Sequence, residues 1–149
     1  MIINRFSGMY TFLSNFYPVT VTLDGIEYSS VEHAYQAAKT LNSDLRITIK
    51  YISNPGKVKS AGRSLKLRDD WEQVKLDVML DLIRQKFKDP ILRIKLLDTK
   101  DQELIEGNYW HDNFYGDCFC DNCKDIAGKN NLGKILMMVR DEIRQNYYI

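Results

Sequence analysis

The stretch YSSVEHAYQAAKT, residues 28–40, combines a carboxylate, an amide and an amine at helical spacing. If this stretch is helical, Glu32, Gln36 and Lys39 stand at i, i+4 and i+7 and share one face. Such a polar stripe could hold a polyhydroxylated ligand, with Glu32 as the working group. The alternative is structural, because Ser29-x-x-Glu32 also fits a capping box at a helix start.

A basic segment, GKVKSAGRSLKLRDDW, covers residues 56–71. Lys59 and Arg63 fall at i and i+4 of a short helix, where arginine can make bidentate hydrogen bonds to phosphate and lysine adds a point charge. Gly62 allows another group to approach the backbone closely. Trp71 stands at a helix start, where we expect its ring to be partly exposed for stacking. The alternative is a solvated basic face beside a core tryptophan.

The segment EGNYWHDNFYGD, residues 106–117, is rich in residue types that loops use for binding. Aromatic rings such as Trp110 and Tyr115 flank Asp112, and this pattern suits a flat base with a carboxylate at its edge. The alternative is a loop anchored by its aromatic residues, in which Asp112 only turns the backbone.

All three cysteines lie in CFCDNC, at Cys118, Cys120 and Cys123. An odd number in one tight cluster is a poor disulfide framework. The spacing resembles that of metal ligands, but structural zinc takes four. His111 is the nearby candidate for the fourth, and Asp117 or Asp121 would be less usual. We therefore expect reduced thiols, with no metal and no cofactor; a zinc site at the three cysteines is the alternative.

Composition narrows the class of protein. The chain has 149 residues, 44% of them hydrophobic, and a formal net charge of +1. This length suits one domain, residues 1–149. The near-neutral charge argues against broad electrostatic capture of nucleic acid and leaves a small anionic ligand, or one nucleotide of a larger molecule, as the expected partner. No apolar run approaches the ~20 residues of a membrane span, and the first residues do not resemble a signal peptide, so we expect a cytoplasmic protein without a membrane partner.

The elements that must position these residues follow from local patterns. MYTFLSNFYPVTVTLDGIEYSS predicts short strands, with a hairpin at the Asp-Gly pair. Helical patterns follow from Val31 to about Lys39 and from Leu45 to Ile52, the latter ended by NPG. Pro90 starts a short helix through Leu97, and ELIEGN predicts a strand.

Two longer helices supply apolar faces. RDDWEQVKLDVMLDLIRQKF predicts a helix that Asp69 or Asp70 can cap. Its predicted apolar stripe comprises Trp71, Val74, Val78, Leu82 and Ile83. The C-terminal helix, in NNLGKILMMVRDEIRQ, carries Leu132, Ile135, Leu136, Val139 and Ile143 on one face. Strands come first and helices dominate afterwards, so we expect a mainly helical α+β domain with a small N-terminal antiparallel β element.

Five segments together resemble the NADAR family, also called YbiA-like N-glycosidases. They are FLSNFYPV, YSSVEHAYQAAK, VKSAGRSLKLRDDWEQVKLDVM, LIEGNYWHDNFYG and GKNNLGKILMMVR. The resemblance spans nearly the whole chain and implies a compact, mostly helical α+β domain. It also implies cleavage of N-glycosidic bonds in ribose-linked compounds, without a cofactor.

The resemblance implies two substrate classes and a set of site residues. The substrates are ribosylamino-linked intermediates of riboflavin synthesis and ADP-ribose attached to guanine. Carried over motif by motif, the expected catalytic positions are Glu32, Trp71 and Asp112. The expected substrate contacts are Asn15, Phe16, Lys39, Lys59, Arg63, Trp110 and Tyr115. Many relatives have tryptophan where this chain has Tyr115, and the smaller ring is expected to affect the preferred base.

The chemistry suits these assignments, because cleavage of the bond develops oxocarbenium character that a carboxylate can stabilise. We expect Glu32 to position or deprotonate water, and Asp112 to orient the ribose or assist the leaving base. Two other functions compete with this one. One is a module that binds ADP-ribose or a nucleotide without cleaving it, and the other is a zinc-supported nucleic-acid-binding protein.

Overall fold

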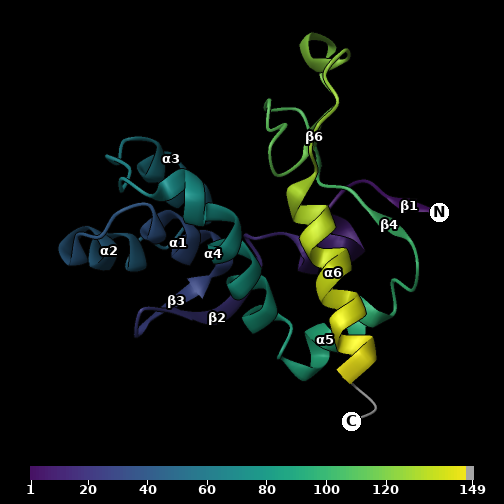
Figure 1. Cartoon of the computed structure of the whole chain (residues 1–149), viewed down its shortest axis with the longest axis horizontal. Helices are drawn as coiled ribbons and strands as arrows, with labels where there is room; N and C mark the ends of the chain where they lie inside the picture. Colours follow the sequence, from purple (N-terminus) through teal and green to yellow (C-terminus); the bar gives the residue numbers. More distant parts are fainter. Residues whose placement is uncertain (147–149) are drawn as a thin grey trace. The chain divides into compact units, whose positions relative to one another are not determined.

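The computed structural model describes residues 1–146 of the chain, which fall into two compact units. One unit is continuous, from Asn15 to Lys88, and the other joins residues 1–14 to the chain from Asp89 onward. The predicted domain of residues 1–149 runs through both units and past the described residues, so its one-domain organisation stays a prediction. Figure 1 shows the elements of each unit along the chain.

The continuous unit begins with the predicted hairpin. Strands β2 (Pro18–Leu23) and β3 (Ile26–Ser30) pair antiparallel. Asp24 and Gly25 connect them with positive φ angles of 49° and 81°, as a tight hairpin turn requires. The strand alternation and the Asp-Gly pair therefore predicted this element correctly.

Four helices complete this unit: α1 (Val31–Ala38), α2 (Ser43–Lys50), α3 (Pro55–Arg63) and α4 (Trp71–Lys86). The first of them contacts the other three and the hairpin. All eight of its residues are buried, including Glu32 and Gln36. A helix surrounded on every side needs small side chains, and its alanines supply them. Its buried polar groups must find partners inside the protein.

Helix α4 begins at Trp71 as predicted, and α3 begins at Pro55, within the tripeptide NPG. The tripeptide NPG starts α3, because Asn54 Oδ1 accepts from the backbone N–H of Gly56 and Pro55 occupies the first turn. Helix α2 ends before it, at Lys50, two residues earlier than the predicted end at Ile52. Asp70 holds the N-cap position of α4 but makes no capping hydrogen bond. Its carboxylate instead pairs with Arg68, at 2.6 Å. The predicted aspartate cap is therefore wrong as a side-chain interaction.

The apolar face of α4 is rotated slightly from the predicted stripe. Trp71, Leu82 and Ile83 are buried as expected, whereas Val74 and Val78 are only half-buried. Met79 and Lys86 are buried in their place. Lys86, the last residue of α4, is fully buried, which is unusual for a lysine.

The second unit contains short elements and two helices: β1 (Ile2–Ile3), a 3-10 helix η1 (Gly8–Leu13), α5 (Pro90–Leu97), β4 (Glu103–Leu104), β5 (Gly107–Asn108), β6 (Asp117–Cys118), a 3-10 turn η2 (Asp121–Cys123) and α6 (Asn131–Asn146). β1 pairs with β4 and β5 with β6, both in parallel. The predicted strand at MYTFL is wrong, because Gly8 turns the chain with a φ of 59° into the 3-10 helix. The predicted ELIEGN strand is divided into β4 and β5.

The C-terminal helix α6 carries the core of this unit. Leu132, Ile135, Leu136 and Val139 are buried as predicted, and Ile143 is half-buried. α5 begins and ends where Pro90 and Leu97 predicted, and it packs on α6. The chain is thus mainly helical α+β with a small N-terminal antiparallel hairpin, which confirms the predicted fold class. None of the helices within residues 1–146 is long and apolar enough to cross a bilayer.

Candidate functional site

Glu32 lies in the first turn of α1, but it does not form the expected capping box. The helix N-cap is Ser30, one residue later than predicted, because β3 continues through that residue. Ser30 Oγ accepts from the backbone N–H of His33. The Glu32 backbone N–H donates to the carbonyl of Asn15 at 3.1 Å. The predicted capping box is therefore wrong, whereas Glu32 does lie in the first turn of the helix, where a carboxylate suits the helix dipole.

The predicted polar stripe on α1 is present. Gln36 Nε2 donates to Glu32 Oε1 at 2.8 Å, across one helical turn. The two residues are only 5% and 7% exposed, so the carboxylate is held by an amide away from bulk water. Burial of this kind is costly unless function or further partners justify it. Glu32 is therefore a candidate catalytic residue.

Lys39, at the C-cap of α1, is the centre of a group of cations. Burial lowers the pKa of Lys39, and the nearby charges of Arg63, Lys59 and Lys75 lower it further, while Glu32 raises it. One carboxylate and several cations are therefore close enough to Lys39 to change its pKa. The predicted i, i+4 pair of Lys59 and Arg63 does lie on a helix, α3. An anionic group beside these cations would be favourable.

Gly62 brings α3 close to α1. A Cβ atom on Gly62 would lie 1.8 Å from Gln36 Oε1, so any larger residue there would force the Gln36 side chain to move. The predicted close approach at Gly62 is confirmed, and its neighbour is the amide that holds Glu32. Gln36 Oε1 is buried and accepts no hydrogen bond from any residue that the structure describes.

His33 is structural. Its Nε2 lies 2.6 Å from the carbonyl of Ile52, and its Nδ1 lies 2.6 Å from Ser30 Oγ. A carbonyl only accepts, so Nε2 carries the proton and Nδ1 accepts from the serine hydroxyl. Both ring nitrogens are thus used in holding the helix start, and the imidazole is not a candidate acid or base.

Trp71 does not have the expected partly exposed ring. Only 4% of its surface is exposed, because the start of α4 packs against α1. The indole lies 5.2 Å from the ring centre of Tyr35, tilted by 58°. Lys39 Nζ lies 5.9 Å from that same tyrosine ring. Trp71 therefore supports the cation group through Tyr35 and does not present a free stacking face.

Asn15 and Phe16 lie in the same unit as Glu32. Asn15 fixes the start of α1 through its carbonyl, and its Nδ2 lies 3.6 Å from Met79 Sδ. Its Oδ1 is buried and lacks a hydrogen bond from the part of the chain described. Phe16 is 41% exposed. The pair thus combines a buried polar acceptor with an accessible ring.

Lys86 is a titratable group that the sequence analysis missed. It is fully buried, and burial lowers its pKa from 10.5 to about 7. Its Nζ lies 5.8 Å from the ring centre of Tyr17 and 5.3 Å from that of Phe87. Its spacing from Leu82 and Ile83, at i+4 and i+3, already placed it on the buried face. A lysine with so low a pKa is a functional candidate on physical grounds.

Asp112, in the other unit, is half-buried in a loop that its own carboxylate shapes. Asp112 Oδ1 accepts from the backbone N–H groups of Phe114 and Tyr115, at 3.1 and 2.9 Å. Asp112 therefore does form a backbone turn, as the structural alternative predicted. Both of these hydrogen bonds use one carboxylate oxygen, so the turn does not exclude a second role for the other oxygen.

The aromatic neighbours of Asp112 differ in exposure. Trp110 is 55% exposed, whereas Tyr115 is half-buried and packs edge-on against Phe114 at 4.7 Å. Trp110 is thus accessible for stacking. Tyr115 is tied more closely to the loop, because its carbonyl accepts from the backbone N–H of Leu132 at the start of α6.

The segment GKNNLG has a role that its sequence did not reveal. Asn130, with a φ of 52°, accepts from the backbone N–H of Glu106 and donates to the carbonyl of Leu104. Gly133 comes so close to Leu104 that a Cβ would lie 2.0 Å from that carbonyl oxygen. This segment joins the Asp112 loop and its strands to α6. In the sequence, Asn130 and Gly133 are the residues that could have indicated this role.

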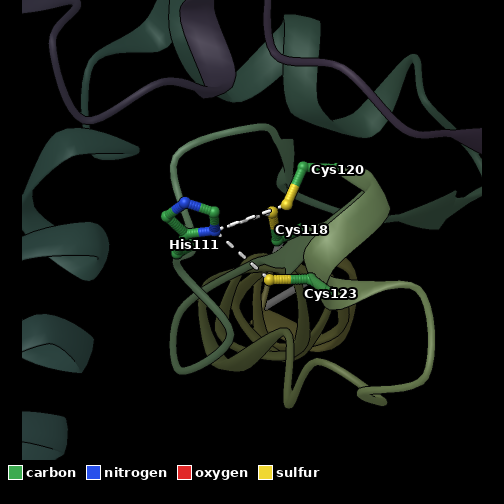
Figure 2. Close-up of side chains that lie close together, drawn as sticks. All are labelled: His111, Cys118, Cys120 and Cys123. Carbon is green, nitrogen blue, oxygen red and sulfur yellow. Dashed lines mark hydrogen bonds between the residues drawn. The ribbon is translucent and has the colours of Figure 1, made fainter.

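A third group of side chains lies in the same loop region. Figure 2 shows the ring of His111 and the sulfurs of Cys118, Cys120 and Cys123 turned toward one another. His111 Nδ1 lies 3.3 Å from the sulfurs of Cys120 and Cys123 and 4.0 Å from that of Cys118. All four ligand atoms lie within 4.8 Å of one another, and the three thiols are not joined in a disulfide. This group could hold a metal ion.

The structure thus gathers one set of predicted residues in the continuous unit and another in the second unit. Glu32, Lys39, Lys59 and Arg63 belong to the first set, and Asp112, Trp110 and Tyr115 to the second. That the two sets act on one substrate stays a prediction.

The chain is similar to known proteins over nearly its whole length. The model of the NADAR domain matches residues 4–144. A riboflavin biosynthesis protein of Vibrio vulnificus is 36% identical over 91% of this chain, which spans 36% of that protein's length. The N-glycosidase YbiA of Escherichia coli is 35% identical, covering 95% of this chain and 88% of the relative. The NMR structure of E. coli YbiA superimposes with a TM-score of 0.84 at 34% identity, covering 99% of this chain and 87% of that one.

Proposed function

The chain belongs to the NADAR family, and on this basis we propose that it hydrolyses the N-glycosidic bond of a ribose-linked nucleotide. Relatives across this length are N-glycosidases, and the chain is accordingly a hydrolase of N-glycosyl bonds. The proposal concerns the substrate and the residues that act on it.

The observation that carries the proposal is the buried carboxylate of Glu32, held by Gln36 beside a group of cations. Cleavage of the C–N bond places positive charge on the ribose, which a carboxylate stabilises. Phosphates of a nucleotide carry negative charge, which Lys59 and Arg63 suit. One substrate that has both a ribose and a phosphate accounts for both features.

The hydrolysis divides between two acids. Glu32 orients and deprotonates a water molecule, whose oxygen forms the new bond to the anomeric carbon. The C–N bond breaks, and the base leaves with its bonding electrons and gains a proton. Asp112 orients the ribose or assists that departure with the carboxylate oxygen that the turn does not use. Two carboxylates share comparable work in sugar hydrolysis.

The remaining residues position the substrate. Exposed Phe16 and Trp110 are the rings available to stack on a base, and Asn15 offers a buried acceptor. Trp71 is a positioning residue, because it packs against Tyr35, whose ring lies 5.9 Å from Lys39 Nζ. Tyr115 lies next to the Asp112 turn and tunes the choice of base.

Two substrate classes fit this chemistry: ADP-ribose attached to guanine, free or within nucleic acid, and ribosylamino-pyrimidine intermediates of riboflavin synthesis. The name of the Vibrio relative supports the second class. The group of cations formed by Lys39, Lys59 and Arg63 suits the two phosphates of the first. Both substrates are consistent with a cytoplasmic enzyme.

A substrate panel tests the proposal. The protein is incubated with ribosylamino-pyrimidine phosphates and with ADP-ribosylated guanosine and oligonucleotides, and free base is measured by mass spectrometry. Release of base from one class, abolished by Glu32→Gln, supports the proposal. Tight binding of ADP-ribose in calorimetry with no released base from any substrate would instead make the chain a binding module.

A further inference from the structure

We propose that His111, Cys118, Cys120 and Cys123 form a structural zinc site. The donor set is one imidazole nitrogen and three thiols, and the four atoms lie within 4.8 Å of one another (Figure 2). The inference does not depend on the hydrolase proposal, because no step of that chemistry uses these residues. It also reverses the expectation of no metal that the sequence favoured.

Hydrogen bonding alone does not explain the arrangement. His111 Nδ1 is 3.3 Å from two sulfurs and 4.0 Å from the third. A neutral imidazole nitrogen has either one proton to donate or one lone pair to accept, so it serves one thiol well and not three. Three sulfurs gathered around one nitrogen are the arrangement that a shared central ion produces.

The separations agree with tetrahedral zinc. With Zn–S of about 2.3 Å and Zn–N of about 2.0 Å, tetrahedral angles place nitrogen about 3.5 Å from each sulfur and the sulfurs about 3.8 Å apart. The three nitrogen–sulfur distances, 3.3, 3.3 and 4.0 Å, bracket the first value. The four atoms spread over as much as 4.8 Å, so the sulfurs have to approach one another by up to about 1 Å to seat the ion.

The backbone holds the ligands in place from both sides. Asn108 Oδ1 accepts from the N–H groups of Trp110 and Asp112, on either side of His111, and His111 itself has an unusual φ of 70°. Asn113 Oδ1 accepts from the N–H of Cys118. These hydrogen bonds fix the first two ligands without using their side chains.

The last two ligands stand at the ends of a tight turn. The Cys123 N–H donates to the Cys120 carbonyl at 3.0 Å across η2. This Cys-x-x-Cys spacing is the one that zinc sites commonly use. Cys118 and Cys123 are buried, Cys120 is half-buried and His111 is exposed, so the site opens to solvent on one side.

Four protein ligands complete the tetrahedron and leave no position for a reactive water, so the site is structural and not catalytic. Soft thiolates with one imidazole favour zinc over magnesium or calcium, which take oxygen ligands. The ion would join the two ends of the segment 111–123, which includes Asp112. We therefore expect zinc to hold this segment in place.

The test begins with the full chain purified under reducing conditions and its metal content measured by plasma mass spectrometry. We expect one zinc per chain. Cobalt substitution should give the absorption spectrum of tetrahedral thiolate coordination. Cys120→Ser and His111→Gln remove the two more accessible ligands, and each should weaken zinc binding by more than about tenfold in a chelator competition. Asp121→Asn, in the same turn but outside the ligand set, should keep full zinc.

Three results would overturn the inference. One is wild-type protein that neither contains zinc nor takes up added Zn²⁺ after reduction. Another is unchanged zinc affinity in both ligand variants. The third is a disulfide between two of the cysteines in protein alkylated at lysis. Circular dichroism of each variant, with and without zinc, separates loss of the site from loss of the fold.

Discussion

Gln36 donates a 2.8 Å hydrogen bond from Nε2 to Oε1 of Glu32, and both side chains are buried within α1. This bond fixes one carboxylate oxygen and the plane of the carboxyl group. The backbone of α3 lies directly against the same amide at Gly62. The carboxylate is therefore held by a short chain of contacts that mutations can break one at a time.

Gly62→Ala tests that chain of contacts. Alanine in a helix is normally more stable than glycine by about 1 kcal/mol. Here the added Cβ would lie 1.8 Å from Gln36 Oε1, so we expect instead a loss of about 1–3 kcal/mol from overpacking and a lower kcat as Gln36 moves. Urea unfolding and base-release kinetics measure the two effects. Ser60→Ala, exposed on the same helix, is the control and should keep full activity. A stabilised, fully active Gly62→Ala protein would contradict the argument.

Arg63→Ala tests the anion-binding role of the cations. A charge-assisted hydrogen bond contributes about 1.5–3 kcal/mol, so KM should rise by about 10- to 100-fold with a smaller change in kcat. The dependence of KM on salt should also weaken. Lys66→Ala, an exposed cation just beyond α3, provides the matched control. Equal effects of the two substitutions would mean that Arg63 contributes only general charge.

Asp112→Asn separates the two roles of Asp112. Asparagine keeps the Oδ1 acceptor for the N–H groups of Phe114 and Tyr115, so the loop and the thermal stability should be retained. The negative charge is lost, and we expect kcat to fall by about 100-fold or more. Asp112→Ala should lose both activity and about 1 kcal/mol of stability. If Asp112→Asn is fully active, the residue only shapes the loop.

Because Lys86 is buried, we expect the stability of the protein to depend on pH. Its pKa is lowered from 10.5 to about 7 in the folded protein. Between these values the unfolded chain binds more protons than the folded one, so the free energy of unfolding should rise with pH, by up to about 1.4 kcal/mol per pH unit. At pH values below about 7 both states are protonated, and the destabilisation by burial is fully present.

Lys86→Met should remove this rise, because methionine does not titrate. Urea unfolding from pH 7 to 10.5 gives the measurement. Lys88→Met, an exposed neighbour, should leave the slope unchanged. A slope in Lys86→Met equal to that of the wild type would show that another group titrates.

Sequence patterns predicted those features that depend on local interactions. The hairpin at Asp24 and Gly25, the bounds of α5 and the shared face of Glu32 and Gln36 follow from turn chemistry, proline and helical periodicity. The 3-10 helix at residues 8–13 was missed, because its aromatic residues favour strands and only Gly8 indicates the turn.

Tertiary packing decided the rest. Trp71 is buried because α1 covers it, and no pattern within α4 reveals that neighbour. Ser30 replaced Ser29 as the cap because strand pairing extends one residue further than the pattern shows. His111 was named as a ligand candidate, but only the fold shows its ring to lie among all three sulfurs.

The central claim is that Glu32 carries out hydrolysis of an N-glycosidic bond. Glu32→Gln keeps an oxygen to accept from Gln36, so the fold should survive, and Glu27→Gln, exposed on β3, is the control. The decisive measurement is the rate of base release from the best substrate of the panel, for the three proteins at equal concentration. We predict wild-type rates for Glu27→Gln and a loss of at least about 100-fold for a folded Glu32→Gln. A folded Glu32→Gln protein that releases base at the wild-type rate would contradict the claim.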